Sequence, residues 1–274
     1  MCRLLGYVGA SIQLDRLLYK PKHSLIVQSY QPQEMTSGVV NADGFGIGWH
    51  DRSDETDLPY TYKNVLPIWS DLNLPQIARY VKTECFLGYI RSATPGSPVD
   101  LLNCQPFTHQ NLLFIHNGFI ENFRETLYRP IRNLLNDEAY KFVKGSTDSE
   151  HILALMIHHL QAQPDFSVEK VLQKVLIQLV EMANKYQTEL SANLMLTDGD
   201  RLIASRFSNR QKSPSLYWVR DDLNYPDSVI VASEPMFEGN WNNCPENSII
   251  TVEKNLEVCI NPVSETSYIF NTEA

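Results

Sequence analysis

Apolar residues in the first 120 positions come in short runs separated by polar loops, a pattern typical of β-strands. Helical spacing interrupts this pattern at 14–18 and at 71–82, and Pro75 is expected to interrupt the second of these helices early. A further short apolar turn is expected at 25–27. The apolar runs predict strands at 3–9, 44–50, 61–66, 85–93 and 111–120.

The centre of the chain is predicted to be helical. Thr147-Asp148-Ser149-Glu150 fits a capping box, in which Thr147 caps a helix and the Glu150 side chain reaches back. A second helix is predicted over 167–186. Strands return at 192–197, 202–207, 216–219, 229–232 and 249–252, with a hairpin turn at 198–200 joining the first two.

This order of strands, helices and further strands indicates an α+β protein. Connections between successive strands are mostly too short for right-handed crossovers, so we expect largely antiparallel sheets with helices on their outer faces. The sequence has no internal repeat, low-complexity tract or linker-like segment. We therefore expect residues 1–274 to form a single domain.

The charge and hydropathy of the chain argue against nucleic acids and membranes as binding partners. The chain has 23 Lys and Arg against 32 Asp and Glu, a net charge of -9, without a cluster of basic residues. Nucleic acid is therefore not an expected partner. No apolar stretch approaches the roughly 20 residues of a membrane helix, and the first residues do not form a secretory leader. We expect a cytoplasmic protein with no membrane partner.

The five cysteines are an odd number and show no metal-ligand spacing, so we expect free thiols in a reducing compartment and no metal. Histidines 50, 109, 158 and 159 show no ligand pairing either. The glycine-rich segment 41–49 lacks the order of a dinucleotide fingerprint and is expected to approach another backbone closely or to form a flap.

Cys2 is the unusual cysteine because of its position. Removal of Met1 would leave it as the first residue, with its α-amine and its thiol on one residue. The amine has a pKa of about 7.7–8.0 and the thiol one of about 8.5, so the amine can accept the thiol proton near neutral pH. The ordinary alternative is a small buried residue at an arbitrary position.

Two further segments could carry chemistry. Arg91 ends an apolar strand and precedes a turn-prone stretch, where its guanidinium could clamp a carboxylate, or form an ion pair at the surface. His116-Asn117-Gly118 contains Asn-Gly between apolar residues, which favours a hairpin turn. Such a turn would also expose the Asn117 amide and the Gly118 N–H as a donor pair for an oxyanion.

Asp148 lies in the first turn of the predicted central helix. The helix dipole already explains an acidic residue there. The functional alternative is that its carboxylate binds an ammonium group.

Taken in order, five segments resemble the class II glutamine amidotransferase family: Met1-Cys-Arg-Leu-Leu-Gly-Tyr7, Asp43-Gly-Phe-Gly-Ile-Gly-Trp49, Arg91-Ser-Ala-Thr-Pro-Gly96, His116-Asn-Gly118 and Thr147-Asp-Ser-Glu150. The resemblance implies the N-terminal nucleophile hydrolase fold. This fold is a four-layer αββα sandwich of two mostly antiparallel sheets.

The resemblance also implies roles for site residues. Cys2 would attack a γ-glutamyl amide carbonyl and form a thioester that water hydrolyses. The family pattern has Trp and His where this chain has Ser92 and Pro95, so these two receive no role. The other implied roles are the oxyanion hole for Asn117 and Gly118, the substrate α-carboxylate for Arg91, the α-ammonium for Asp148, and the walls of the same pocket for Thr94 and His116.

The segment Asp43 to Trp49 and the absence of a synthase domain resemble the stand-alone branch of the family. That branch includes the ergothioneine-pathway amidohydrolase that acts on γ-glutamyl-hercynylcysteine sulfoxide, and similar glutathione-degrading proteins. The expected partner is a small γ-glutamyl molecule, no cofactor is implied, and a homo-oligomer is left open. A glutaminase subunit that supplies ammonia to a separate synthase and a non-catalytic binding relative are the alternatives. Loops at 31–43, 95–108 and 233–243 are expected to complete the pocket.

Overall fold

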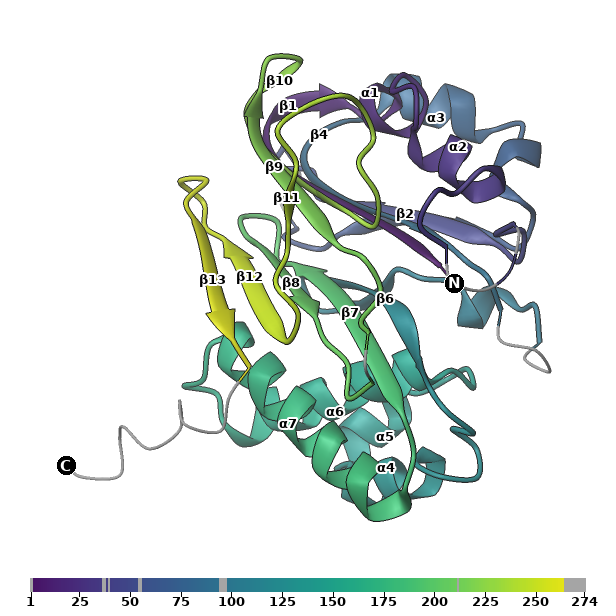
Figure 1. The fold of residues 1–274 in the computed structure, drawn as a ribbon, viewed down its shortest axis with the longest axis vertical. Coiled ribbons are helices and arrows are strands. Elements are labelled where there is room, and N and C mark those ends of the chain that lie inside the picture. The colour runs from purple at the N-terminus through teal and green to yellow at the C-terminus, as the bar shows by residue number, and fades with distance from the viewer. Residues whose placement is uncertain are drawn as a thin grey trace.

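The computed structural model describes residues 2–35, 38, 40–53, 56–93, 98–210 and 212–263 of the chain. Two stacked sheets form its centre (Figure 1), and their paired strands are antiparallel. The first sheet has the order β11 (Asn242–Asn243), β9 (Tyr217–Asp222), β10 (Tyr225–Ala232), β1 (Arg3–Gln13), β4 (Lys82–Ile90), β2 (Phe45–Trp49) and β3 (Tyr60–Asn64). The second has the order β13 (Val258–Pro262), β12 (Ser248–Val252), β8 (Leu202–Arg206), β7 (Leu190–Thr197), β6 (Leu112–Ile120) and β5 (Phe107–His109).

Helices cover the outer face of each sheet (Figure 1), which completes the expected four-layer α+β sandwich. The first sheet carries α1 (Asp15–Leu18), α2 (Leu25–Tyr30) and α3 (Leu74–Tyr80), with the short 3-10 helix η1 (Ile68–Ser70). The second sheet carries α4 (Tyr128–Leu134), α5 (Asp137–Phe142), α6 (Asp148–Ala162) and α7 (Val168–Tyr186). A second 3-10 helix, η2 (Leu101–Asn103), precedes β5.

The two sheets meet through every second residue of their strands. Even positions of β1 such as Leu4 and odd positions of β4 and β6 such as Leu87 and Ile115 form one buried cluster. The alternate positions pack against the helices, for example Phe86 on one side and Phe114 on the other. This period of two decides which face each strand residue presents, and it therefore also orients the site residues at the strand ends.

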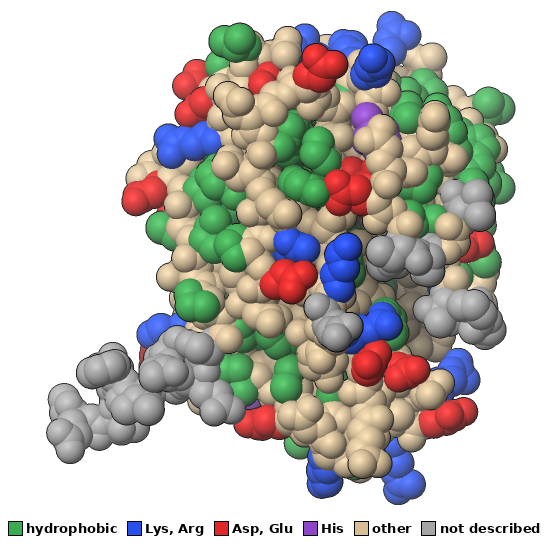
Figure 2. Space-filling view, in the orientation of Figure 1, with side chains coloured by type: hydrophobic (Ala, Val, Ile, Leu, Met, Phe, Trp, Pro, Cys, Tyr) green, Lys and Arg blue, Asp and Glu red, His purple; other side chains and the backbone are tan. Residues whose placement is uncertain are grey.

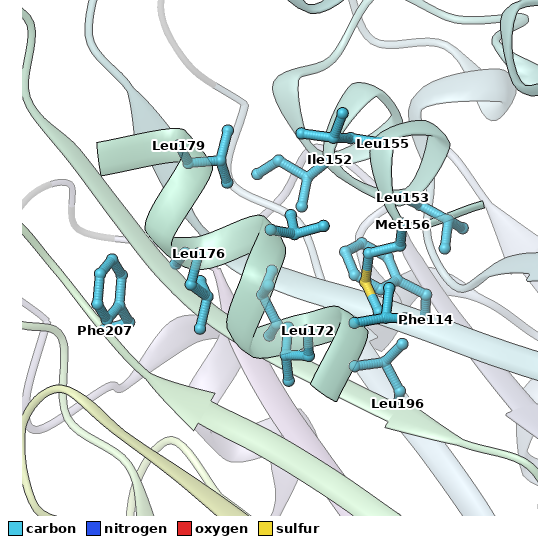
Figure 3. Close-up of a cluster of buried hydrophobic side chains, with 14 of the residues drawn as sticks. Phe114, Ile152, Leu153, Leu155, Met156, Leu172, Leu176, Leu179, Leu196 and Phe207 are labelled. Atoms are coloured by element: carbon cyan, nitrogen blue, oxygen red, sulfur yellow. The ribbon is translucent and has the colours of Figure 1, made fainter. Parts of the chain in front are cut away.

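Helix α6 is buried on most of its surface because α7 and the second sheet both pack against it. Figure 3 shows Leu172, Leu176 and Leu179 of α7 beside Ile152 and Leu155 of α6. Fully burying side chains of this size contributes about 1.5–3 kcal/mol each. The packing fixes the N-terminus of α6 against the second sheet.

Most predicted elements are confirmed to within a few residues, but three predictions that concern helices are wrong. Residues 25–27 begin helix α2 and do not form a turn. Pro75 lies in the first turn of α3, where its missing N–H costs nothing, so it does not interrupt the helix. Thr147 caps α6 as expected, but the Glu150 carboxylate accepts hydrogen bonds from the N–H groups of Lys144 and Gly145 in the preceding loop.

The outer surface carries mixed charges. On the face shown in Figure 2, acidic and basic side chains are interspersed. No helix in the described part of the chain is both long and apolar enough to cross a membrane.

Candidate functional site

A cavity of about 270 Å³ lies where β1 begins, β4 and β6 end and α6 begins. Five of the site residues predicted from the sequence line it, namely Cys2, Arg91, His116, Gly118 and Asp148. Asn117 is not a lining residue, and Thr94 lies outside the described residues. The fold thus brings together residues that are up to 146 positions apart in the sequence.

Cys2 is buried beside the end of β4. Its Sγ lies 3.0 Å from the Tyr89 hydroxyl and accepts a 3.4 Å hydrogen bond from the Ser92 N–H. The register that pairs Arg3 with Ile90 continues to place Cys2 opposite Arg91. Strand pairing alone therefore puts the thiol next to the end of the neighbouring strand.

Arg91 is only 3% exposed, which argues against the alternative of an ion pair at the surface. Its guanidinium donates to the backbone carbonyls of Asp43, at 3.4 Å, and Pro98, at 3.1 Å. Among the described residues it has no carboxylate partner. A buried guanidinium with carbonyl partners only keeps its positive charge available to an anion in the cavity.

Asp148 is the first residue of α6 and lines the same cavity. Its oxygens accept hydrogen bonds from the N–H groups of Ile120, at 2.9 Å, and Ser149, at 2.8 Å. No basic side chain in the described ranges forms an ion pair with it. The N-terminus of α6 stabilises the negative charge of the Asp148 carboxylate in part. The remaining lone pairs of its oxygens can accept hydrogen bonds from a cationic group.

Asn117 and Gly118 lie in the middle of β6, opposite Asn193 and Ala192, so the predicted hairpin turn is wrong. The N–H groups of His116 and Ile120 bond to the side chains of Gln105 and Asp148, on the edge of β6 that faces away from β7. Backbone donors of alternate residues share an edge, so the Gly118 N–H points the same way. Strand β5 pairs with this edge only at 112–114, which leaves the Gly118 N–H facing the cavity.

The Asn117 side chain points to the space between the sheets, as Leu113 and Ile115 do on the same strand. It is 1% exposed, and neither its Nδ2 nor its Oδ1 has a hydrogen-bond partner among the described residues. A buried amide without partners costs about 1–3 kcal/mol. Such an orphaned amide, on a residue between the two cavity-lining residues His116 and Gly118, is a candidate for ligand binding.

His116 links three elements and keeps one tautomer. Its Nε2 lies 3.1 Å from the Ser191 carbonyl, which can only accept, so Nε2 carries the proton and Nδ1 accepts from the Ser149 hydroxyl at 2.8 Å. Burial lowers the pKa of His116, and the Asp148 carboxylate offsets this only in part. The ring is therefore neutral and joins β6, β7 and α6.

Several lining residues were not predicted from the sequence. Residues 122–125, which follow β6, form part of the wall, as do Tyr89 and Ser146, while Asn103 and Gln105 lie in the expected loop 95–108. Of the three loops expected to complete the pocket, only 95–108 contributes to the described lining. The alternation of β4 could have indicated Tyr89, because it lies two residues before Arg91 on one face.

The cysteines form no disulfide bonds. All five cysteines are free thiols, four of them buried and Cys259 exposed. The described residues contain no group of three or more His, Cys, Asp or Glu side chains placed to hold a metal ion.

Residues 1–223 match the family model for class-II glutamine amidotransferases. The chain belongs to this family. One relative is the probable glutamine amidotransferase DUG3 of Saccharomyces cerevisiae, 31% identical over 310 residues, which cover 98% of this chain and 86% of DUG3. Another is the gamma-glutamyl-hercynylcysteine sulfoxide hydrolase of Mycobacterium tuberculosis, 28% identical over 92% of this chain and 93% of the hydrolase.

Solved structures show the same fold. A glutamine aminotransferase class-II domain protein from Silicibacter pomeroyi superposes with a TM-score of 0.69 at 24% identity, covering 95% of this chain and 98% of that chain. The glutamine phosphoribosylpyrophosphate amidotransferase of B. subtilis superposes with a TM-score of 0.66 at 15% identity, covering 96% of this chain and 49% of that chain. This class-II glutamine amidotransferase therefore has the N-terminal nucleophile hydrolase fold and is an enzyme of the amidohydrolase type.

Proposed function

We propose that this enzyme hydrolyses the γ-glutamyl amide bond of a small conjugate with Cys2 as nucleophile, releasing glutamate. One observation carries the proposal. The same cavity holds the Cys2 thiol, the Arg91 guanidinium and the Asp148 carboxylate, and neither charged group has an ion-pair partner among the described residues. A glutamyl head group carries the complementary carboxylate and ammonium.

The head group orients the reacting carbonyl. With its carboxylate at Arg91 and its ammonium at Asp148, a glutamyl substrate would be held at both ends, so that its side chain extends toward Cys2. Fixing a reactant in this way converts binding energy into a lower barrier, by up to about 7–11 kcal/mol in well-oriented systems.

The proposed reaction has two stages. After Met1 is removed, the Cys2 α-amine takes the thiol proton and Sγ attacks the amide carbon. The oxyanion receives hydrogen bonds from the Gly118 N–H and the Asn117 Nδ2. The α-ammonium of Cys2 then returns the proton to the leaving amine of the substrate. Water then hydrolyses the thioester, releasing glutamate and the thiol. The open edge of β6 at Gly118 and the unpartnered Asn117 amide support the proposed oxyanion hole.

The first substrate to test is γ-glutamyl-hercynylcysteine sulfoxide, which would place the enzyme in ergothioneine biosynthesis. The 28% identical hydrolase that aligns over nine tenths of both chains supports this choice. Glutathione and other γ-glutamyl peptides are alternatives. A glutaminase that supplies ammonia to a synthase is another, and the match to an amidotransferase family model favours keeping it in the comparison.

A release assay with three substrates tests the proposal. The enzyme is given the sulfoxide conjugate, glutathione and glutamine, and free glutamate is measured to obtain kcat/KM for each. We expect the sulfoxide conjugate to have the highest value. A highest value for glutamine would indicate the ammonia donor, one for glutathione would indicate peptide degradation, and no release from any substrate would contradict the proposed function.

Cys2→Ala tests the nucleophile. We expect this variant to lose turnover while substrate binding stays near normal, because the covalent step is removed. Cys85→Ala is the matched control, since Cys85 is a buried thiol on β4 whose Sγ lies 2.8 Å from the Thr197 hydroxyl and does not line the cavity. Residual activity of Cys2→Ala within about tenfold of wild type would be too small a loss for a covalent nucleophile.

A further inference from the structure

Tyr89 is the buried residue in closest polar contact with the sulfur of Cys2. Its hydroxyl lies 3.0 Å from Sγ, the tyrosine is 3% exposed, and both residues line the cavity. Neither the motifs in the sequence nor the proposed reaction gives this side chain a role.

The partner of the Tyr89 hydroxyl distinguishes it from other buried tyrosines of the protein. Tyr7 donates its hydroxyl proton to the carbonyl of Ala10, and Tyr225 donates to the carbonyl of Arg16. Within the described ranges, the only hydrogen-bond partner of the Tyr89 hydroxyl is Cys2 Sγ. Its contact is therefore with a group that changes charge, while theirs are with neutral backbone.

Strand β4 fixes this contact. Tyr89 pairs with Leu4 and packs between the sheets, and Arg91 follows two residues later on the same face. The Ser92 N–H, just beyond the strand, approaches the same sulfur at 3.4 Å. One strand end thus supplies a side-chain and a backbone group to the thiol.

The phenol keeps its proton at neutral pH. Burial raises the pKa of Tyr89 well above its ordinary value, and the neighbouring Cys2 raises it further. The Tyr89 hydroxyl can accept a hydrogen bond from the Cys2 thiol. Once the thiol has lost its proton, the Tyr89 hydroxyl can only donate a hydrogen bond to the sulfur.

We propose that Tyr89 donates a hydrogen bond to the Cys2 thiolate and, together with the Ser92 N–H, stabilises the charge on the reacting sulfur. This rests on the proposed function of Cys2 as nucleophile. The thiol proton goes to the α-amine and Tyr89 keeps its own. When the S–C bond forms, the negative charge passes to the oxyanion, and when the thioester breaks, the electron pair returns to the sulfur. Tyr89 therefore favours both formation of the nucleophile and its departure.

Other charged or titratable groups face this sulfur and stay constant in the test. They are Arg3 on β1, Arg91 just after β4, His116 on β6 and Cys104 ahead of β5, together with the Cys2 α-amine once Met1 is removed. A comparison between variants that differ only in the Tyr89 hydroxyl removes their contributions.

Alkylation of Cys2 in Tyr89→Phe tests the proposal without turnover. The rate of modification by iodoacetamide is followed from pH 5 to pH 10 by peptide mass, so that the exposed Cys259 is counted separately. Losing a hydrogen bond to the charged sulfur disfavours the thiolate, so we expect the rate at pH 7 to fall about tenfold and its pH midpoint to move up by about one unit. With substrate, we expect kcat to fall while KM changes little.

Tyr7→Phe is the matched control. Tyr7 is a buried tyrosine on the adjacent strand β1, and it faces the helices instead of the cavity. A loss of stability without a change in Cys2 alkylation is expected for this variant. Tyr89→Met provides a second variant without the hydroxyl, should Tyr89→Phe fold poorly.

An alkylation profile of Tyr89→Phe or Tyr89→Met that matches wild type would overturn the proposal and leave Tyr89 a structural residue. This outcome is distinct from failure of the proposed function, which would appear as turnover that survives Cys2→Ala.

Discussion

Cys2, Tyr89 and Arg91 meet because antiparallel pairing places the start of β1 beside the end of β4. Each contributes a different property to the cavity: a thiol, a neutral hydroxyl donor and a buried cation. These buried polar groups have few hydrogen-bond partners within the protein. Their burial disfavours folding and is typical of a site that binds a charged ligand.

At the residue scale, Arg91→Lys tests the recognition of a carboxylate. A lysine keeps the charge but loses the planar pair of donors, so we expect KM for a γ-glutamyl substrate to rise at least tenfold while kcat changes less. Arg220→Lys serves as control, because Arg220 is exposed on β9 and pairs with Asp221. Steady-state kinetics with the preferred substrate make the measurement, and an unchanged KM would remove Arg91 from the head-group site.

The thiol and the charged residues of the cavity were predictable from the sequence, but most of the other lining residues and the way in which they are held were not. The N-terminal position of Cys2 and the strand-end position of Arg91 can be read from the sequence, and both residues line the cavity. Asn-Gly is a strong turn signal, yet pairing with β7 keeps Asn117 and Gly118 extended. Tyr89 was missed because its contact joins residues 87 positions apart.

At the element scale, strand β6 serves the site through its edge. Glycine is required at position 118 because a Cβ there would lie 1.9 Å from the Ser191 carbonyl oxygen and 2.3 Å from His116 Nε2. The N–H of Gly118 lies on the cavity edge of β6, between the N–H groups of His116 and Ile120, which already donate to other side chains.

Gly118→Ala should therefore be destabilising. The nearest obstacle is backbone, so β7 must shift, and we expect a loss of about 3 kcal/mol in the free energy of unfolding. In the control, Gly239→Ala, the nearest atom is the end of the Asp222 side chain at 3.0 Å, and little change is expected. Urea unfolding compares the two variants, and equal stabilities would contradict this account of β6.

Helix α6 places Asp148 through its first turn, and His151 holds that turn. His151 Nδ1 donates to the Thr147 carbonyl at 2.7 Å, and its Nε2 accepts from the Arg132 Nε at 3.0 Å. The contact with Arg132 requires an unprotonated Nε2, and so a neutral ring. Burial lowers the pKa of His151 to about 4, a value that also includes a smaller lowering by Arg132 and the opposing effects of the Thr147 carbonyl and Asp148.

Stability should consequently fall on mild acidification. Between pH 6.5 and pH 4, His151 is protonated in the unfolded chain but not in the folded chain. As the pH falls through this range, this difference lowers the free energy of unfolding by up to about 1.4 kcal/mol per pH unit. His151→Gln can keep one donor and one acceptor but does not titrate, and we expect a shallower slope in this window. Urea unfolding at several pH values measures it, and identical slopes in both proteins would refute the assignment.

At the scale of the whole molecule, local patterning was enough to predict the class of fold but not its assembly. Alternating runs indicated most strands, and short connections indicated antiparallel pairing, as observed. The pairing of β1 with β10 joins residues more than 200 positions apart, which no local signal specifies. The three-residue β5 and the short helices α4 and α5 were missed because they owe their form to the core around α6.

Intact mass of the protein, quenched in acid during turnover of a γ-glutamyl substrate, tests the central claim most directly. The account predicts a chain without Met1 that carries one γ-glutamyl group as a thioester on Cys2, absent from Cys2→Ala. An active enzyme that retains Met1, or a γ-glutamyl group attached to any other residue, would contradict it.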